Sequence, residues 1–174
     1  MQIYGLGFLN WLINIIIKLQ KLLFKMNKSF FKQIMTTQIP IAWIAGVRLH
    51  SWEENKVSTK VKFGFLNQNP FKSMFWAVQG MAAEFSSGLM ASAKIQQSGE
   101  SVSMLVLGMQ SKYYKKAIGK IIFTCDQGEA ITNAINQAII TGEGVTLLVK
   151  SKGVDEEGDV VSEFEFTWTF KVRK

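Results

Sequence analysis

Residues 67–93, NQNPFKSMFWAVQGMAAEFSSGLMASA, decide the fold of this chain. The stretch opens with an Asn-Pro turn signal and continues with apolar and small residues at helical spacing, so it predicts one long helix. At about 100° per residue the large apolar side chains share one stripe, which is typical of a helix that faces a core. These are Met74, Val78, Met81, Phe85 and Leu89.

A single acidic residue, Glu84, interrupts this predicted helix. It lies in a lane of small side chains beside the apolar stripe, and small residues mark positions where another backbone or a ligand comes close. The lane consists of Ala77, Gly80, Ser87, Gly88 and Ala91. Glu84 is therefore a candidate site residue. The alternative is an interface carboxylate that pairs with a lysine across a dimer.

Composition limits what surrounds this helix. A chain of 174 residues with 48% hydrophobic and 19% charged residues is large enough for a buried core. A net charge of +7 favours anionic partners: nucleic acid, a membrane surface or a phosphate-bearing small molecule. With one cysteine, Cys125, and one histidine, His50, the sequence offers no internal disulfide and no zinc site, and we predict no metal. We interpret Cys125 as a small core residue. A single cysteine also fits a protein of a reducing compartment.

The N-terminal part is predicted to be an amphipathic helix, or two in series, that ends before Pro40. Lysines recur there every three or four residues opposite an apolar face: Lys18, Lys21, Lys25, Lys28 and Lys32. Residues 1–39 are thus predicted as an extension of a main domain over 40–174. Residues 4–34 either pack on the domain or a partner subunit, or lie peripherally on an anionic membrane. Without a convincing signal peptide, we predict a cytoplasmic location, with membrane association as the alternative.

Beyond Pro40 the hydrophobic period changes to two, which indicates strands. Residues 47–52 and 57–63 predict a hairpin, and four further strands and a short helix follow. The strands are predicted over 101–109, 117–125, 145–152 and 160–172, and the helix over 128–140. The order predicts an α+β fold, a curved antiparallel sheet of about five or six strands wrapped around the long helix.

This layout resembles the hotdog fold, and the stretch around Glu84 is similar to the active-site segment of hotdog acyl-CoA thioesterases. In the phenylacetate-pathway and hydroxybenzoyl-CoA branches, that segment is an Asn, a few residues, His-Gly-Gly, and then an Asp or Glu. Here Asn69 takes the place of the Asn, residues 75–77 (Phe-Trp-Ala) that of His-Gly-Gly, and Glu84 that of the carboxylate. Residues 113–119, YYKKAIG, resemble the family's entry into its next strand. The resemblance covers about residues 35–172 and indicates an uncharacterised thioesterase-like branch.

The resemblance implies a mechanism of thioester hydrolysis. Glu84 acts as general base or nucleophile, while Asn69 orients the water or the carbonyl. Backbone N–H groups near Trp76 and Ala77 polarise the carbonyl. The substrate-binding residues are then Trp76, Ala77, Phe75 and Gln79, with Lys112, Lys115 and Lys116 meeting the nucleotide phosphates of coenzyme A. The thioester is substrate or ligand, and no other cofactor is expected.

Two functional alternatives to thioester hydrolysis stay open. Trp76 stands where the family has its first Gly, and Phe75 where it has His, which favours a non-catalytic module that binds acyl-CoA or a fatty acyl group. A membrane-peripheral lipid-handling protein is a third hypothesis. Asn69 before Pro70 is otherwise a turn residue or helix cap, and Gln79 a satisfied surface amide. We expect a homodimer or a dimer of dimers, and no nucleic acid, because no interleaved basic-aromatic motif occurs.

Overall fold

A computed structural model describes residues 32–33 and 35–173. The chain divides into two units, Met1–Pro40 and Ile41–Lys174, and the sheet and the long helix belong to the second. The amphipathic helix predicted for residues 4–34 falls outside the described residues, apart from 32 and 33. Among the helices that the structure describes, none has the length and apolar character needed to cross a membrane.

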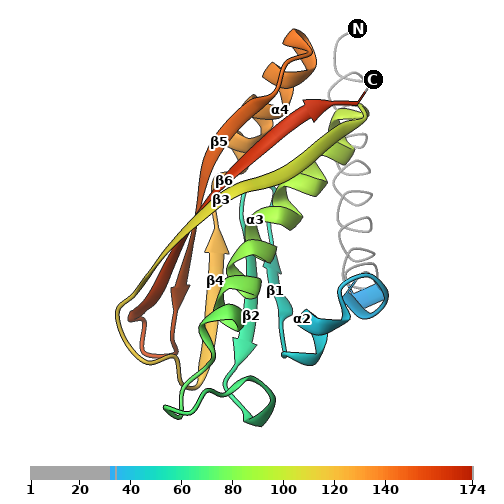
Figure 1. The fold of residues 1–174 in the computed structure, drawn as a ribbon. Helices are drawn as coiled ribbons and strands as arrows, with labels where there is room; N and C mark the ends of the chain where they lie inside the picture. The colour runs from blue at the N-terminus through green and yellow to red at the C-terminus, as the bar shows by residue number, and fades with distance from the viewer. Residues whose placement is uncertain (1–31, 34, 174) are drawn as a thin grey trace, which may run out of the picture. The chain divides into compact units, whose positions relative to one another are not determined.

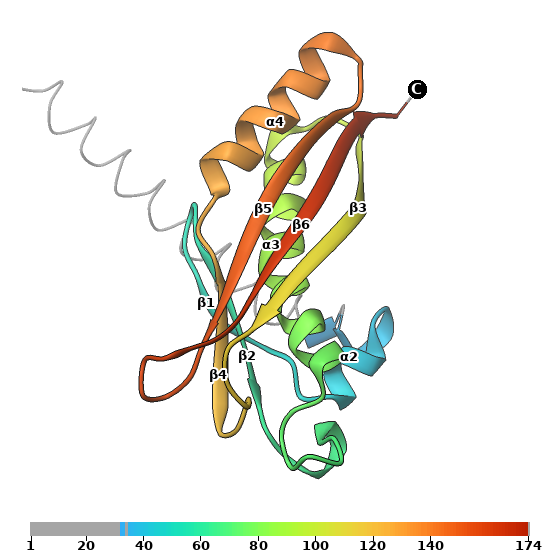
Figure 2. The same ribbon diagram turned by 60° about the vertical axis from the view of Figure 1, so that its left-hand side comes forward.

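The second unit is a six-stranded antiparallel sheet with the order β1-β2-β4-β5-β6-β3. The sheet curves around one long helix, α3 (Trp76–Ser98), while a second helix, α4 (Gly128–Thr141), lies between β4 and β5 in the chain (Figures 1 and 2). This arrangement confirms the predicted α+β fold. The strands are β1 (Arg48–Trp52), β2 (Val57–Lys62), β3 (Val102–Tyr113), β4 (Lys120–Cys125), β5 (Val145–Val154) and β6 (Val160–Val172).

Every second residue of β6 faces the core side of the sheet. Its alternate aromatic side chains are buried, and two of them, Phe164 and Trp168, lie against α3. The buried set is Phe164, Phe166, Trp168 and Phe170. The predicted hairpin is confirmed as β1 and β2, which pair in antiparallel register. The fourth strand begins at Lys120 rather than at residue 117, after Gly119 adopts a left-handed conformation with φ of 72°. A short helix, α2 (Pro40–Ile44), precedes β1.

The long helix begins nine residues later than predicted and ends five residues later. Residues 68–74 form a small hairpin instead, in which Gln68 and Met74 are bridge partners. The Asn69 carboxamide oxygen accepts hydrogen bonds from the N–H groups of Phe71 and Ser73 at 2.9 and 3.3 Å, so this Asn-Pro turn competes successfully with the helical pattern. A one-turn 3-10 helix, η1 (Phe65–Asn67), precedes the hairpin. At the other end α3 stops where Gly99 takes φ of 74°.

Much of the small-residue lane of α3 packs against the sheet of the same subunit. An alanine at position 80 in place of Gly80 would bring its Cβ to 3.5 Å from the Phe164 ring, and one at Gly88 would come equally close to Trp168. The Trp168 indole N–H donates to Ser87 Oγ at 3.1 Å. Small residues on the helix thus accommodate the large aromatic residues of β6. Of the predicted apolar stripe, Met74, Val78 and Phe85 are buried, whereas Met81 and Leu89 are only half-buried.

Candidate functional site

The Glu84 carboxylate is half-buried on α3 without a partner in the described part of the chain. Its oxygen Oε1 lies over Gly88, where an added Cβ would be 2.9 Å away. Burial raises the pKa of Glu84 to about 7. The group therefore exchanges a proton near neutral pH, as a general base must. No ion pair to a lysine of the same copy forms within the described residues.

The N-terminus of α3 presents two backbone donors. Phe75 precedes the helix and supplies no side-chain cap, while its own N–H donates to the Asn67 carbonyl. The N–H groups of Val78 and Gln79 donate to the Phe75 carbonyl. Among the described residues, the N–H groups of Trp76 and Ala77 have no acceptor. Free N–H groups at the positive end of a helix dipole polarise a carbonyl or stabilise an oxyanion.

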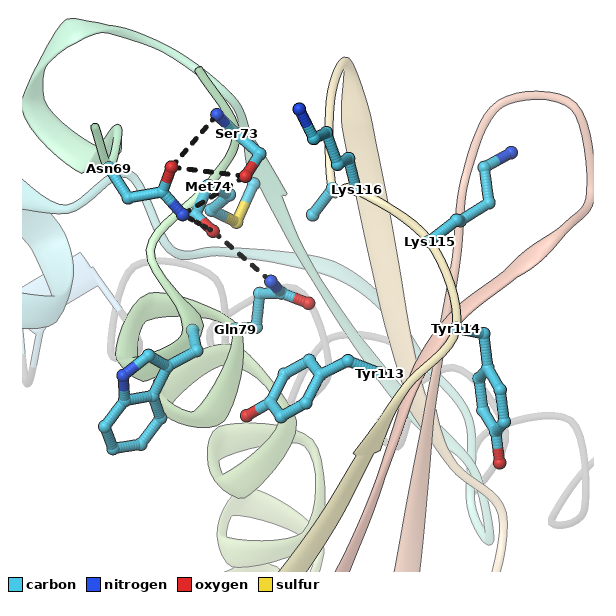
Figure 3. A pocket seen from close by; sticks show the side chains of 10 residues that line it. Asn69, Ser73, Met74, Gln79, Tyr113, Tyr114, Lys115 and Lys116 are labelled. Carbon is cyan, nitrogen blue, oxygen red and sulfur yellow. Dashed lines mark hydrogen bonds between the residues drawn. The ribbon is translucent and has the colours of Figure 1, made fainter. Parts of the chain in front are cut away.

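A pocket of about 300 Å³ adjoins this helix start (Figure 3). Its two walls come from the entry to α3 and from the connection between β3 and β4, which face one another in the figure. The lining residues are Asn69, Ser73, Met74, Trp76, Gln79, Tyr113, Tyr114, Lys115, Lys116 and Ala117.

The pocket brings together five of the predicted site residues: Asn69, Trp76, Gln79, Lys115 and Lys116. Sequence reasoning assigned no site role to Ser73 or Met74, which join the pocket because the Asn69 turn folds them back. Tyr113, Tyr114 and Ala117 also line the pocket. They belong to residues 113–119, which resemble a segment of the thioesterase family, and that resemblance could have identified them as pocket residues.

Four predicted site residues do not line the pocket: Glu84, Phe75, Ala77 and Lys112. Phe75 packs edge-to-face on Trp76, with ring centroids 5.6 Å apart. Lys112 lies opposite Glu163 in the register of β3 and β6. Glu84 lies eight residues beyond Trp76, roughly 12 Å along the helix at 1.5 Å per residue. Within one copy, the carboxylate and the pocket are separate.

The two amide side chains of the pocket, Asn69 and Gln79, are already hydrogen-bonded. Asn69 donates from Nδ2 to Ser73 Oγ at 3.1 Å and accepts from two backbone N–H groups, so its role as a turn residue accounts for its contacts. Gln79 is only 4% exposed, which makes the interpretation as a surface amide wrong. Its Nε2 donates to the Met74 carbonyl at 3.4 Å, and its Oε1 accepts from Ser162 Oγ at 2.8 Å.

The two lysines that line the pocket differ in whether a carboxylate pairs with them. Lys115 forms ion pairs with Asp155 at 2.6 Å and Asp159 at 2.8 Å, and these carboxylates raise its pKa. The Lys116 ammonium donates to the Phe71 carbonyl at 3.2 Å, and no described carboxylate pairs with it. Lys116 is therefore the better placed of the two to meet an anionic group. The described residues contain no cluster of metal-ligating side chains.

Comparison with solved structures places the chain among hotdog-fold proteins. A candidate thioesterase from Shewanella oneidensis has a TM-score of 0.71 at 12% identity, covering 84% of this chain and 97% of its own. A protein of unknown function from Chlorobaculum tepidum has a TM-score of 0.74 at 16% identity, with coverages of 86% and 96%. A thioesterase from Haemophilus influenzae has a TM-score of 0.61 at 11% identity, with coverages of 83% and 90%.

The fold shared with these structures confirms the predicted hotdog fold. No curated protein matches the sequence. A family model, described as a domain of unknown function, matches residues 27–170, which is most of the chain. The chain belongs to this family, DUF4442.

Proposed function

We propose that this protein hydrolyses acyl thioesters, with coenzyme A thioesters as the substrate class and Glu84 as the catalytic carboxylate. The observation that carries the proposal is the unpaired Glu84 carboxylate, whose pKa is raised to about 7. The two free N–H groups beside the pocket support it, as do fold neighbours that are named as thioesterases.

In the proposed reaction Glu84 takes a proton from water as the oxygen attacks the thioester carbonyl carbon. The carbonyl π electrons move to oxygen, and the N–H groups of Trp76 and Ala77 stabilise this oxyanion. Collapse of the tetrahedral intermediate breaks the carbon–sulfur bond. The thiolate leaves with the electron pair and takes the proton that Glu84 holds. The products are a carboxylic acid and a free thiol.

From the separation of Glu84 and the pocket we infer that a second copy completes the site. β3 is an edge strand of the sheet and exposes Leu105, Leu107 and Met109. An exposed apolar edge strand is suited to pairing with another chain. In the proposed homodimer, the pocket of one subunit receives Glu84 of the other.

A panel of short, long and aryl acyl-CoA thioesters tests the activity. We expect Glu84→Gln to abolish hydrolysis while circular dichroism stays unchanged. Glu143→Gln, an exposed residue in the loop after α4, is the control and should retain full rates. Hydrolysis by Glu84→Gln at the wild-type rate would refute the assignment.

Mixing two inactive variants tests the shared site. One subunit carries Glu84→Gln, and the other carries Trp76→Pro, which removes a pocket N–H. Random pairing leaves one intact site in half of the dimers, so about a quarter of the wild-type activity should return. A monomer by light scattering at micromolar concentration, or no recovery despite subunit exchange, would rule out the shared site.

The position of Trp76 favours one second candidate, a module that binds acyl-CoA without hydrolysing it. The indole lines the pocket at the helix start, where it occupies space near the two N–H donors. Calorimetric binding of a CoA ester by wild type, with no hydrolysis of any thioester in the panel, would favour this alternative.

A further inference from the structure

One end of the second unit combines exposed apolar side chains with lysines that form no ion pair with a described carboxylate. Residues 63–75, between β2 and α3, lie beside the connection 114–119 between β3 and β4 at the lower end of Figure 1. Phe65, Leu66 and Phe71 are exposed to 84, 72 and 74% of their surface, and Ile118 is also exposed. We call these four side chains, with Lys62, Lys72 and Lys116, the loop surface.

Hydrogen bonds hold the two segments of the loop surface together. The Phe63 N–H donates to the Gly119 carbonyl at 2.7 Å, and the Met74 N–H donates to the Ala117 carbonyl at 2.8 Å. Lys116 adds its bond to the carbonyl of Phe71. The apolar side chains of the two segments are thus presented together.

The tip of the first segment is a constrained turn. The Lys72 N–H donates to the Asn69 carbonyl at 3.1 Å, and Lys72 adopts a positive φ of 55°. The Asn69 side chain also stabilises the turn by accepting from the Phe71 N–H. Phe71 is consequently held outward by a structured backbone, so little conformational entropy remains to be lost when it inserts into a partner.

The charge around these side chains is positive. The sequence contains no Asp or Glu from residue 55 to residue 83. Lys62, Lys72 and Lys116 have no ion pair with any described carboxylate. In the acidic turn between β5 and β6, three of the four carboxylates are held in ion pairs: Lys115 pairs with Asp155 and Asp159, and Lys120 pairs with Glu156 at 3.2 Å.

We propose that the loop surface docks on an anionic lipid bilayer. Phe65, Leu66, Phe71 and Ile118 enter the boundary between headgroups and acyl chains, while the lysines contact lipid phosphates. Lysine is depleted at protein–protein interfaces but attracted to anionic membrane surfaces, so its combination with protruding aromatic side chains favours lipid. This inference goes beyond the proposed hydrolysis and does not require it.

Docking would also place the pocket close to the bilayer. Lys116 belongs to both the loop surface and the pocket lining, and the pocket residues Ser73 and Met74 follow the exposed turn directly. An acyl group that moves between the membrane and the protein would therefore travel only a short distance to the pocket.

A site-specific fluorescence experiment tests the proposal on the full chain. Leu66→Cys carries an environment-sensitive dye. Ile140→Cys on α4, a residue that is 83% exposed, carries the same dye as control. Cys125 is buried and should react little. With vesicles of 30% phosphatidylglycerol in phosphatidylcholine, we expect a blue shift and quenching by bromolipids at residue 66 only. Pure phosphatidylcholine should give a much smaller response.

Variants complete the test. Phe65→Ser/Leu66→Ser/Phe71→Ser should reduce co-sedimentation with the anionic vesicles at least tenfold, whereas Ile140→Ser should bind as wild type does. Vesicle binding without a response at residue 66 would assign the membrane contact to another part of the chain and overturn the proposal. A concentration-dependent response without vesicles would show that a second copy covers the loop surface, which also overturns it. Thioester hydrolysis is measured separately, so either proposal can fail alone.

Discussion

The carboxylate of Glu84 occupies space that a side chain at Gly88 would need. A Cβ on Gly88 would lie 2.9 Å from Glu84 Oε1, and 3.5 Å from the Trp168 ring. The two residues are one helical turn apart, so they are neighbours on the α3 surface. Gly88 therefore leaves room for the carboxylate to lie along the helix, where burial raises its pKa.

We predict that Gly88→Ala moves the Glu84 carboxylate toward solvent and lowers its pKa toward the ordinary value. The contact with Trp168 is ordinary packing, and alanine gains about 1 kcal/mol of helix propensity over glycine, so the fold should not be destabilised. Nuclear magnetic resonance titration of the labelled carboxyl and a thermal melt measure the two effects.

Gly80→Ala is the matched control for that change. It has the same gain in helix propensity, and its added Cβ meets only Phe164 at 3.5 Å. The Glu84 pKa should stay near 7 in this variant. Equal pKa values in Gly88→Ala, Gly80→Ala and wild type would show that Gly88 does not set the position of the carboxylate.

The pH dependence of stability follows from the same carboxyl. Its pKa is about 7 in the folded chain against an ordinary value of 4.5, so the folded state binds more protons between these values. The contribution of this carboxyl to the free energy of unfolding is most favourable below pH 4.5. It falls by at most roughly 3 kcal/mol as the pH rises through 7. Urea unfolding of Glu84→Gln should show a flatter profile from pH 5 to 8 than wild type does.

Hydrolysis should show the opposite trend over the same range. A general base acts when deprotonated, so the rate at saturating substrate should rise with pH through about 7 and then level off. A rate that falls between pH 6 and 8, with stable protein, would contradict Glu84 as the base.

Gln79 offers a test of the polar contact that joins α3 to β6. We predict that Gln79→Leu destabilises the chain by about 1–3 kcal/mol, because the Ser162 hydroxyl and the Met74 carbonyl lose a partner in a buried position. Chemical denaturation measures the change in the free energy of unfolding.

The double variant Gln79→Leu/Ser162→Ala should be less destabilised than the sum of the two single changes, since it removes both partners at once. Strict additivity in the cycle would mean that the bond between Gln79 and Ser162 contributes nothing to stability.

Much of the fold was predictable because strand periodicity is a local signal. The alternation of Phe164, Phe166, Trp168 and Phe170 with polar residues identified β6 and its buried face from sequence alone. The start of α3 was not predictable in this way. The segment before it has helical apolar spacing, but the Asn69 side chain and Pro70 form a turn, and Met74 pairs with Gln68.

The site was predictable in its chemistry more than in its geometry. The type and position of Glu84 in a lane of small residues singled it out, yet its raised pKa depends on its burial in the folded chain, which no local pattern encodes. Charge type alone suggested Lys115 as a phosphate ligand, but the fold brings Asp155 and Asp159 from a distant turn to neutralise it. Long-range contacts decide which charges remain available.

Trp76 allows the role of a single backbone N–H to be isolated. It is the first residue of α3, where proline is well tolerated, and Phe75 before it has φ of −59° and ψ of 133°, which suits a residue that precedes proline. Trp76→Pro thus removes one proposed oxyanion donor without breaking a hydrogen bond within the helix. Trp76→Ala is the control, because it removes the indole but keeps the N–H.

We predict that Trp76→Pro lowers kcat for thioester hydrolysis by about 10²–10³-fold relative to Trp76→Ala, the usual effect of losing one oxyanion donor. The Tm values of the two variants should agree within a few degrees, and KM should change little between them, because the donor acts mainly on the transition state. If both variants hydrolyse thioesters equally fast, the Trp76 N–H is not part of the catalytic site. If Trp76→Ala is more active than wild type on bulky substrates, the indole limits which acyl groups reach the donors.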